Sequence, residues 1–594
     1  MNPTDTVSET APSDALWFGH PRQLARLFTT EMWERFGFYG MRALLTLYLT
    51  KHFLFSDRTT NGIYGGFAAM VYLTPLIGGL LADRYLGAKR SVKFGALIMA
   101  LGYFTLCFGG EQARPWAMID GVRHEVVQDH VVDRPSATGA EARYVVLGGQ
   151  KLAIKGQADG TIALVAGDGH VAHTVARDGF VSGGDRSPWV TMVLLLAIGL
   201  ITVGNGFFKP NISTMVGELY RPGDTRKDAG FTIFYMGINV GALLSQTLCP
   251  LLADTIGWWA GFLLAAVGML ASWAQIQFDG GRLAAVGNPP AQGGPDRALA
   301  IYAGAVIAVP AVMWLFNNLM TATPVEPGAG IVGYVLALPL MGKLMFGTFL
   351  IAVPAILAYA FATGSRVEFH MMVAAMVLIT FNTVFWTLFE QAGTSLTLFA
   401  DRNTNLDVLG LFRISAAQVQ LFNALFIVML APLMSMLWVA LGRRGMEPST
   451  PLKFGIALTG VGGGFLFLVW GAGFAGADAR VSVWWLAGLY LIHTLSELCI
   501  SPVGLSMITK LSLARIVGLM MGVWFLSIAV AQYVAGVVAQ VASVETVGGE
   551  VTNAIASLQT YVHVFATIGW IAVAVGVLLL AIAWPLKWLM HGVN

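Results

Sequence analysis

Charged side chains are scarce in this 594-residue chain. Asp, Glu, Lys and Arg together make up 11% of the residues, against about 25% in an ordinary soluble domain. Hydrophobic residues account for 56%, which excludes a soluble globular protein and is typical of a polytopic membrane protein. The net charge is only +2, so electrostatics give no general reason to expect binding to nucleic acid.

Cysteine is also rare. Cys107, Cys249 and Cys499 all lie inside apolar stretches, where a thiol is usually a small buried hydrophobe. The sequence therefore indicates neither a disulfide framework nor a metal site. The polar first twenty residues lack a basic segment followed by an apolar one, so we expect no cleaved signal peptide.

Apolar stretches of about 20 residues or more, bounded by charged or Gly/Pro-rich breaks, predict fourteen membrane spans. Six precede a Gly/Pro-rich linker at 287–295 and eight follow it. The predicted spans are 24–54, 61–82, 91–109, 188–217, 229–253, 258–278, 298–320, 331–362, 367–399, 413–441, 452–474, 482–510, 515–542 and 560–588. Lys and Arg gather on one side of this arrangement, which places both termini in the cytoplasm.

The segment 111–187 is too polar to span a membrane. Three short apolar runs in it are separated by Gly148-Gly149 and by Asp159-Gly160, the pattern of strands joined by tight turns. The runs are 144–147, 151–155 and 161–165. We therefore predict a small β-rich extracytoplasmic insert. Its histidines match no metal-binding spacing and are interpreted as solvated loop residues: His124, His130 and His173.

Several charged side chains nevertheless fall inside predicted spans. Each costs about 2.5 to 3.5 kcal/mol near the bilayer centre and so indicates a pathway, a pair or a misjudged span boundary. They are Glu31, Glu34, Arg35, Arg42, Lys209, Glu390 and Glu497. Four acids and three bases leave one carboxylate without a fixed counter-charge if all share a cavity, which suggests proton uptake and release. The bases lie in the first half and two of the acids in the second, an arrangement that suits alternating access.

Two stretches carry a specific resemblance. Residues 31–39, E-M-W-E-R-F-G-F-Y, are similar to the first-helix E-x-x-E-R-F motif of the proton-dependent oligopeptide transporter (POT or PTR) family of the major facilitator superfamily. Residues 234–243 resemble the F-Y-x-x-I-N-x-G-[SA]-L signature of the same family. The resemblance implies an all-α polytopic membrane protein with the major facilitator superfamily fold. Here that fold would be two six-helix bundles plus two extra transmembrane helices, with the β-rich insert.

The implied domain organisation follows the predicted spans. The parts are a disordered cytoplasmic N-terminus at 1–20, an N-terminal bundle at 21–278, the insert at 111–187, a linker with the two extra helices at 279–363, and a C-terminal bundle at 364–594.

The family implies a symporter that imports di- and tripeptides with protons by alternating access, and not an enzyme. It implies no cofactor apart from the coupling proton. The expected partners are peptides, protons and the lipid bilayer, with no nucleic acid, and the expected form is a functional monomer in the bacterial cytoplasmic membrane.

The resemblance also implies roles for individual residues. The proton-coupling group would be Glu31, Glu34, Arg35 and Lys209. The peptide would be bound through its carboxylate, backbone and amino terminus by Arg42, Lys209, Asn239, Tyr39 and Glu497. An outer gate would pair Arg42 with Glu390, and an inner gate would pair Lys209 with Glu497. Peptide side chains would meet Tyr72, Trp386, Asn423 and Trp524, for which ordinary packing or interface anchoring is the alternative interpretation.

Two positions depart from the family pattern. Tyr64-Gly65-Gly66 stands where animal members have a proton-sensing histidine, and Phe38 replaces a tyrosine found in many members. Alternative functions are a proton-coupled carrier of another small organic solute or of nitrate, a channel and a membrane enzyme. Intramembrane charges that are few and of both signs disfavour a channel. Missing phosphate-binding loops, H-E-x-x-H pairs and Ser/His/Asp sets disfavour an enzyme and an ATP-driven pump.

Overall fold

Long helices make up most of the protein. The computed structural model describes residues 16–593, apart from 129–142, 158, 222–223, 225, 291–295, 323–332 and 334–335. Fourteen helices in the described part are at least 19 residues long. They are α1 (Gln23–Leu47), α2 (Asp57–Leu81), α3 (Ala88–Leu106), α4 (Pro188–Glu218), α5 (Lys227–Thr255), α6 (Trp258–Gln277), α7 (Ala298–Met320), α9 (Leu340–Thr363), α10 (Arg366–Phe389), α12 (Leu421–Arg443), α13 (Thr450–Ala472), α14 (Val483–Leu511), α15 (Val517–Val541) and α16 (Ala554–Leu589). Each overlaps one predicted span.

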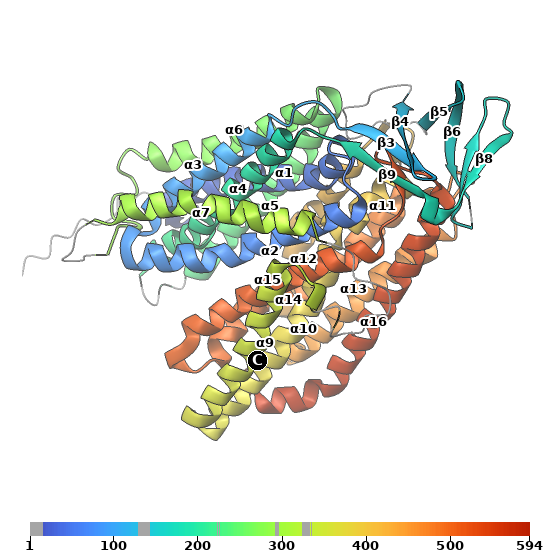
Figure 1. The fold of residues 1–594 in the computed structure, drawn as a ribbon. Helices are drawn as coiled ribbons and strands as arrows, with labels where there is room; N and C mark the ends of the chain where they lie inside the picture. Colours follow the sequence, from blue (N-terminus) through green and yellow to red (C-terminus); the bar gives the residue numbers. More distant parts are fainter. Residues whose placement is uncertain are drawn as a thin grey trace, which may run out of the picture.

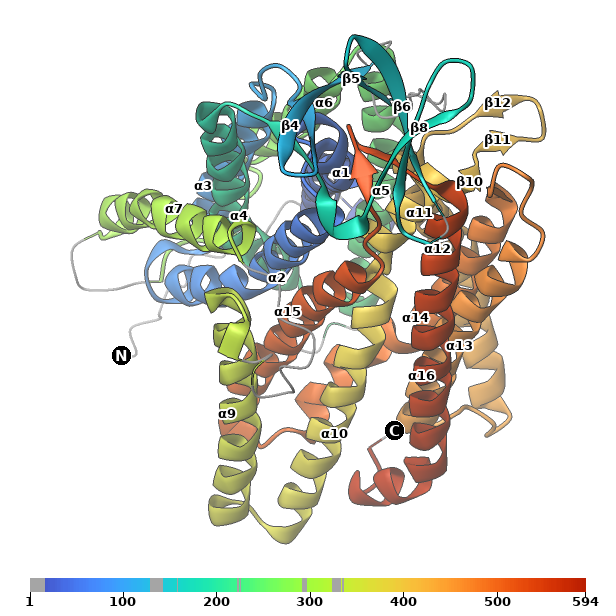
Figure 2. The same ribbon diagram turned by 45° about the vertical axis from the view of Figure 1, so that its right-hand side comes forward.

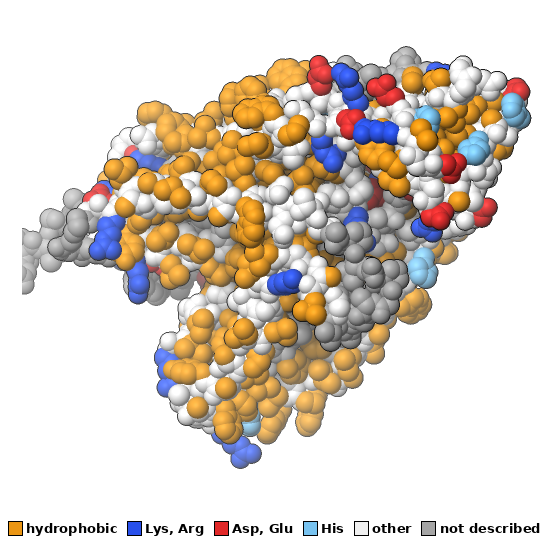
Figure 3. Space-filling model, viewed as in Figure 1, with side chains coloured by type: hydrophobic (Ala, Val, Ile, Leu, Met, Phe, Trp, Pro, Cys, Tyr) orange, Lys and Arg blue, Asp and Glu red, His pale blue; other side chains and the backbone are white. Residues whose placement is uncertain are grey.

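Twelve of these helices are long and apolar enough to cross a membrane. The other two, α1 and α3, have more charged side chains, such as Glu34 within α1 and Lys93 in the first turns of α3. On the face shown in Figure 3, hydrophobic side chains cover most of the helices, and most charged side chains lie on the sheet and towards the opposite ends of the bundles. That α1 and α3 also cross the bilayer, giving fourteen spans, remains a prediction.

The helices form two bundles, α1–α6 and α10–α16, which meet at one end and diverge towards the other (Figures 1 and 2). Helix α7 packs on α4 and α2, whereas α9 packs on α15 and α10, so each bundle takes one of the extra helices. The predicted domain boundaries at 278 and 363 fall at the ends of α6 and α9. We call the end where the bundles meet the sheet end, because it carries the insert.

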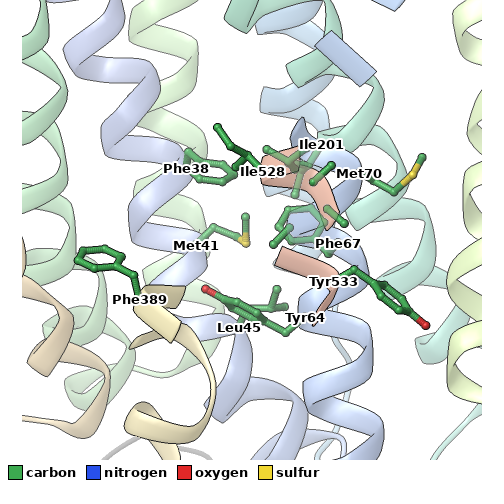
Figure 4. Packing of buried hydrophobic residues seen from close by; sticks show 14 of the residues in the cluster. Phe38, Met41, Leu45, Tyr64, Phe67, Met70, Ile201, Phe389, Ile528 and Tyr533 are labelled. Carbon is green, nitrogen blue, oxygen red and sulfur yellow. The ribbon is translucent and has the colours of Figure 1, made fainter. Parts of the chain in front are cut away.

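At the sheet end the two bundles are in close contact. The backbones of α2 and α15 touch where a Cβ atom on Gly65 would lie 2.7 Å from the Cα atom of Gly536, the kind of approach that glycine allows between membrane helices. Phe67 of the first bundle lies near Ile528 of the second, and Leu45 lies beside Tyr64 within the first bundle (Figure 4).

One predicted span is broken. Residues 367–399 form α10, a 3-10 turn (Glu390–Gly393) and the short helix α11 (Ser395–Asn403). The helix turns away at Gly393, where a Cβ atom would lie 1.8 Å from the hydroxyl of Tyr64. This break places Glu390 at the interface between the bundles.

The insert is a seven-stranded antiparallel sheet in the order β8-β7-β6-β5-β4-β3-β9. Its strands are β3 (Arg114–Ile119), β4 (Val122–Gln128), β5 (Arg143–Leu147), β6 (Gln150–Gly156), β7 (Ile162–Val165), β8 (Val171–Val175) and β9 (Phe180–Asp185). The three strands predicted from the sequence are β5, β6 and β7. Gly148 and Gly149 both have positive φ, as a tight hairpin turn requires. Of the histidines, His173 lies 2.8 Å from Asp120, and His130 lies outside the described residues.

The prediction of a disordered N-terminus is wrong for residues 16–20. Leu16–Trp17 pairs with His20–Pro21 in a short antiparallel ladder. His20 is hydrogen-bonded to the hydroxyl of Tyr220 at 3.0 Å, and the ring of Trp17 packs on Phe28 at 5.8 Å. These tertiary contacts order a segment that composition alone marks as disordered. Residues 1–15 lie outside the described range.

A buried ion pair links the bundles at the sheet end. Asp57 is the first residue of α2. Both of its carboxylate oxygens lie 2.6 Å from the guanidinium of Arg402 in α11. Both side chains are 1% exposed. Lys51 adds a second pair with Asp401 at 2.5 Å.

We expect Asp57→Asn to lower the free energy of unfolding by about 3 to 5 kcal/mol, because the change leaves the buried guanidinium without its counter-charge. Thermal unfolding of the detergent-solubilised protein measures this. Asp296→Asn is the matched control, because its pair with Arg90 is exposed and such pairs contribute about 0 to 1 kcal/mol. Equal losses of stability in both variants would contradict the prediction.

Candidate functional site

A cavity of about 300 Å³ lies between the two bundles and is lined by both. The first bundle contributes Arg35, Tyr39, Arg42, Tyr72, Lys209, Tyr235, Ile238, Asn239, Ala242 and Gln246. The second contributes Trp386, Phe389, Glu390, Ala392, Gln420, Asn423, Ala424, Ile427, Tyr490, His493, Glu497 and Ser501. Most of the predicted site residues are therefore brought to one place.

The charged motif of α1 forms a buried cluster beside this cavity. Nε of Arg35 lies 2.7 Å from Glu31 and 2.9 Å from Glu34, and the three residues are at most 5% exposed. The spacing i, i+4 puts Glu31 and Arg35 on one helical face. Arg35 lines the cavity, whereas the two carboxylates lie behind it.

The cluster is short of hydrogen-bond donors. Among the described residues, none donates a hydrogen bond to the second oxygen of Glu31 or to either oxygen of Glu34. Two carboxylates thus share one guanidinium, and the cluster has a net charge of −1 when both are ionised. A proton on either carboxylate would satisfy an oxygen and cancel that charge.

The α5 signature explains how α1 and α5 fit together. A Cβ atom on Gly241 would lie 2.2 Å from the carbonyl oxygen of Met32, so only glycine allows this approach. Asn239, two residues earlier, lines the cavity and donates a hydrogen bond to the carbonyl of Tyr235 at 3.1 Å. The signature therefore supplies both the helix contact and a polar group at the site.

Arg42 joins the two bundles across the cavity. Its guanidinium pairs with Glu390 of the second bundle, which is the pairing implied for the outer gate. Nε of Arg42 also donates a hydrogen bond to the hydroxyl of Tyr64 at 2.6 Å. Tyr64, the first residue of the Tyr64-Gly65-Gly66 stretch, is thus a hydrogen-bond partner of Arg42, a role that the sequence did not indicate.

The pairing implied for the inner gate is not formed. Nζ of Lys209 lies 3.6 Å from the centroid of the Tyr72 ring, and Glu497 accepts a hydrogen bond from Asn423 at 3.0 Å. Within the part of the chain that the structure describes, no ion pair joins Lys209 to Glu497. One implied gate is closed and the other is open, in agreement with the divergence of the bundles in Figure 1.

The remaining predicted residues divide into two groups. Tyr39, Tyr72, Trp386 and Asn423 line the cavity. Trp524 of α15 does not. Its indole ring fills the space left by Gly504 of α14, where a Cβ atom would lie 2.5 Å from the ring, and it packs between helices in this conformation.

Sequence reasoning missed several polar lining residues. Tyr490 and His493 precede Glu497 by seven and four residues on α14. They therefore lie on the same helical face, and the spacing from Glu497 could have identified them. Gln246 follows Asn239 by seven residues on α5 and lies on the same face in the same way. Gln420 had no such signal, because it lies in the 3-10 turn before α12.

The POT family model matches residues 90–278 and 351–556, parts of both bundles. The chain belongs to the POT family. The Yersinia enterocolitica protein named Peptide transporter YePEPT is 31% identical over 551 residues, 90% of each chain. The Edwardsiella piscicida Dipeptide and tripeptide permease A is 30% identical over 568 residues, 95% of each chain.

A solved structure has the same architecture. The crystal structure of peptide transporter POT in complex with sulfate superposes with a TM-score of 0.71 at 29% sequence identity, covering 97% of both chains. The protein therefore has the fold of a POT transporter and is a multi-pass membrane protein, not an enzyme.

We expect Tyr64→Phe to destabilise the protein by about 1.5 to 3 kcal/mol, because the charged Nε donor of Arg42 loses its acceptor in a buried site. Tyr72→Phe is the matched control, because the Tyr72 ring face, which the variant keeps, makes the contact with Lys209. Unfolding temperatures followed by tryptophan fluorescence compare the two variants. A fall in Tyr72→Phe as large as that in Tyr64→Phe would contradict this role for Tyr64.

Proposed function

We propose that this POT-family protein is a proton-coupled symporter that imports di- and tripeptides by alternating access. The observation that carries the proposal is the separation of unlike charges in one cavity. Lys209 on the first bundle and Glu497 on the second face the same space without pairing with each other. A short peptide is a zwitterion whose carboxylate and ammonium groups match these two sides.

Peptide binding involves both walls of the cavity. Arg42 and Lys209 attract the peptide carboxylate, Tyr39 and Asn239 hydrogen-bond the backbone, and Glu497 holds the amino terminus. The cavity volume of about 300 Å³ is at the lower end of the range for small-molecule sites, which suits a short peptide better than a long one.

Proton coupling follows from competition for Arg35. When Glu31 and Glu34 are both ionised, they hold the guanidinium. A proton on one of them weakens that hold, and the positive charge of Arg35 then attracts the peptide carboxylate in the cavity. Lys209 on the same side adds a second cation. The proton is the only coupling species, and no further cofactor is needed.

Alternating access requires the gates to exchange. Here the pair of Arg42 with Glu390 closes the sheet end while Lys209 and Glu497 are apart. Opening of the sheet end would break the first pair and bring the second together. We place the sheet outside the bacterial cytoplasmic membrane and both termini in the cytoplasm, following the Lys/Arg bias of the loops, and we propose that a monomer is the transporting unit.

Uptake of radiolabelled dialanine into liposomes tests the proposal. We expect the wild type to accumulate the peptide only with an inward proton gradient. Glu34→Gln should exchange peptide across the membrane but lose gradient-driven accumulation, because the side chain at position 34 can no longer take up a proton. Glu125→Gln, at an exposed site on the sheet, is the matched control and should accumulate peptide as the wild type does.

Two results would count against the proposal. Accumulation by Glu34→Gln at the wild-type level would remove the α1 cluster from coupling. If no dipeptide moves under either condition, the substrate is another small organic solute or nitrate, which a solute screen in the same liposomes would identify.

A further inference from the structure

His493 lines the cavity, but the binding scheme above assigns it no role. It lies on α14 one helical turn before Glu497 and lines the same cavity, although its side chain is almost fully enclosed, with the residue 1% exposed. The imidazole packs between the rings of Phe389 at 6.1 Å and Phe465 at 4.9 Å. Gly464 of α13 leaves room for it, because a Cβ atom there would lie 2.5 Å from the ring.

The hydrogen bond of His493 fixes its chemistry. Nε2 lies 3.0 Å from the carbonyl oxygen of Val461. A carbonyl only accepts, so Nε2 carries the proton, and Nδ1 of the neutral ring presents a lone pair. Nδ1 makes no hydrogen bond with any residue that the structure describes. Because His493 lines the cavity, this lone pair can accept a hydrogen bond from a donor that arrives with the substrate.

We propose that Nδ1 of His493 accepts a hydrogen bond from the amino terminus of the bound peptide, beside Glu497. An ammonium group has three donors, and one oxygen of Glu497 is already engaged by Asn423. Side chains at positions 493 and 497 are neighbours on one helical face. His493 and Glu497 therefore form a two-acceptor site that selects a free amino group. This inference rests on the peptide transport proposed above.

Inhibition of labelled dialanine uptake by two competitors tests the role of His493. The competitors are dialanine and its des-amino analogue propanoyl-alanine. We expect His493→Leu to weaken dialanine about tenfold and the analogue less than about twofold, since only dialanine loses a hydrogen bond to a charged donor. His493→Asn loses the same bond to Val461 but keeps an oxygen near the position of Nδ1, so it should stay within about threefold of wild type.

Equal losses for both competitors, or no advantage of Asn over Leu, would reduce His493 to a packing residue. His493→Phe serves the same purpose if the Leu variant does not fold. A wild type that takes up no dialanine would instead refute the proposed function, so the two failures are distinguishable.

A second, independent observation concerns the insert. The chain that enters and leaves the sheet is bound to the first bundle. The amide of Ala113 donates to the carbonyl of His52 at 2.9 Å, and Arg186 donates to the carbonyl of Phe53 at 2.8 Å. The guanidinium of Arg186 also lies 4.1 Å from the centroid of the Phe55 ring.

The same sheet binds the second bundle. It contacts the loop between α15 and α16, which contains β14 (Thr546–Val547) and β15 (Glu550–Val551). Ser182 donates to the carbonyl of Thr546 at 2.7 Å, and the amide of Gly156 donates to the carbonyl of Thr552 at 3.0 Å. Val547 is 2% exposed and belongs to the hydrophobic core of the sheet.

We infer that the insert is a clasp that holds the sheet end closed and must release this loop when that end opens. Alternating access separates the two bundles there, and an element bound to both cannot keep all of these contacts. The clasp therefore stabilises the conformation described here over the one open at the sheet end.

A reversible cross-link tests the clasp. A Cβ atom on Gly156 would lie 3.2 Å from the Cβ atom of Thr552, close to the separation of about 3.5 to 4.5 Å in disulfides. We expect oxidised Gly156→Cys/Thr552→Cys to lose dialanine uptake about tenfold or more, and a reductant to restore it. Val146→Cys/Lys151→Cys, a cross-strand pair inside the sheet, is the control and should transport equally well in both redox states.

Full transport by the cross-linked protein would refute the clasp. Uptake by the reduced form shows separately that transport itself is intact.

Discussion

The ion pair between Arg42 and Glu390 connects two bundles at a depth where neither charge is surrounded by water. A charge in such a place must be paired or it destabilises the membrane-embedded structure by several kcal/mol. Because the partners come from opposite bundles, pairing also fixes how the bundles sit against each other. The break of the chain after α10, which places Glu390 at this interface, and the hydroxyl of Tyr64, which supports Arg42, both serve the same contact.

From that pair towards the sheet, cross-bundle contacts follow one another in layers. Asp57 and Arg402 form a second buried pair, and Lys51 binds Asp401 and approaches Glu550 of the loop after α15 at 3.6 Å. The sheet itself then binds this loop. The layers differ in chemistry, from buried charge to backbone hydrogen bonds to a buried Val547, but they all oppose separation of the same ends. The unpaired state of Lys209 and Glu497 is the counterpart of this closure at the other end of the cavity.

Long elements were predictable because a membrane span is encoded locally, in about 20 apolar residues. The charged motif of α1 was predictable as a cluster because helical spacing alone brings Glu31 to Arg35. Contacts between distant segments had no such signal. Asp57 and Arg402 come from different bundles. The ring of Trp524 of α15 packs against Gly504 of α14 instead of lining the cavity. Residues 16–20 are ordered by contacts with Tyr220 and Phe28. Strands β3, β4, β8 and β9 were missed because their sequences alternate weakly, and they become strands by pairing with neighbours.

In the proposed function, Arg35 is the residue that links proton binding to peptide binding. Its guanidinium lies beside two carboxylates that lack other donors, and Arg35 also lines the cavity. A negative charge arriving in the cavity competes with those carboxylates for the same cation. Such competition is reciprocal, because the factor by which a proton on the cluster raises the affinity for a carboxylate equals the factor by which the carboxylate raises the affinity for the proton. Protonation of the α1 cluster and binding of a carboxylate in the cavity therefore favour each other before the bundles move. The movement of the bundles can then follow the change in charge at Arg35.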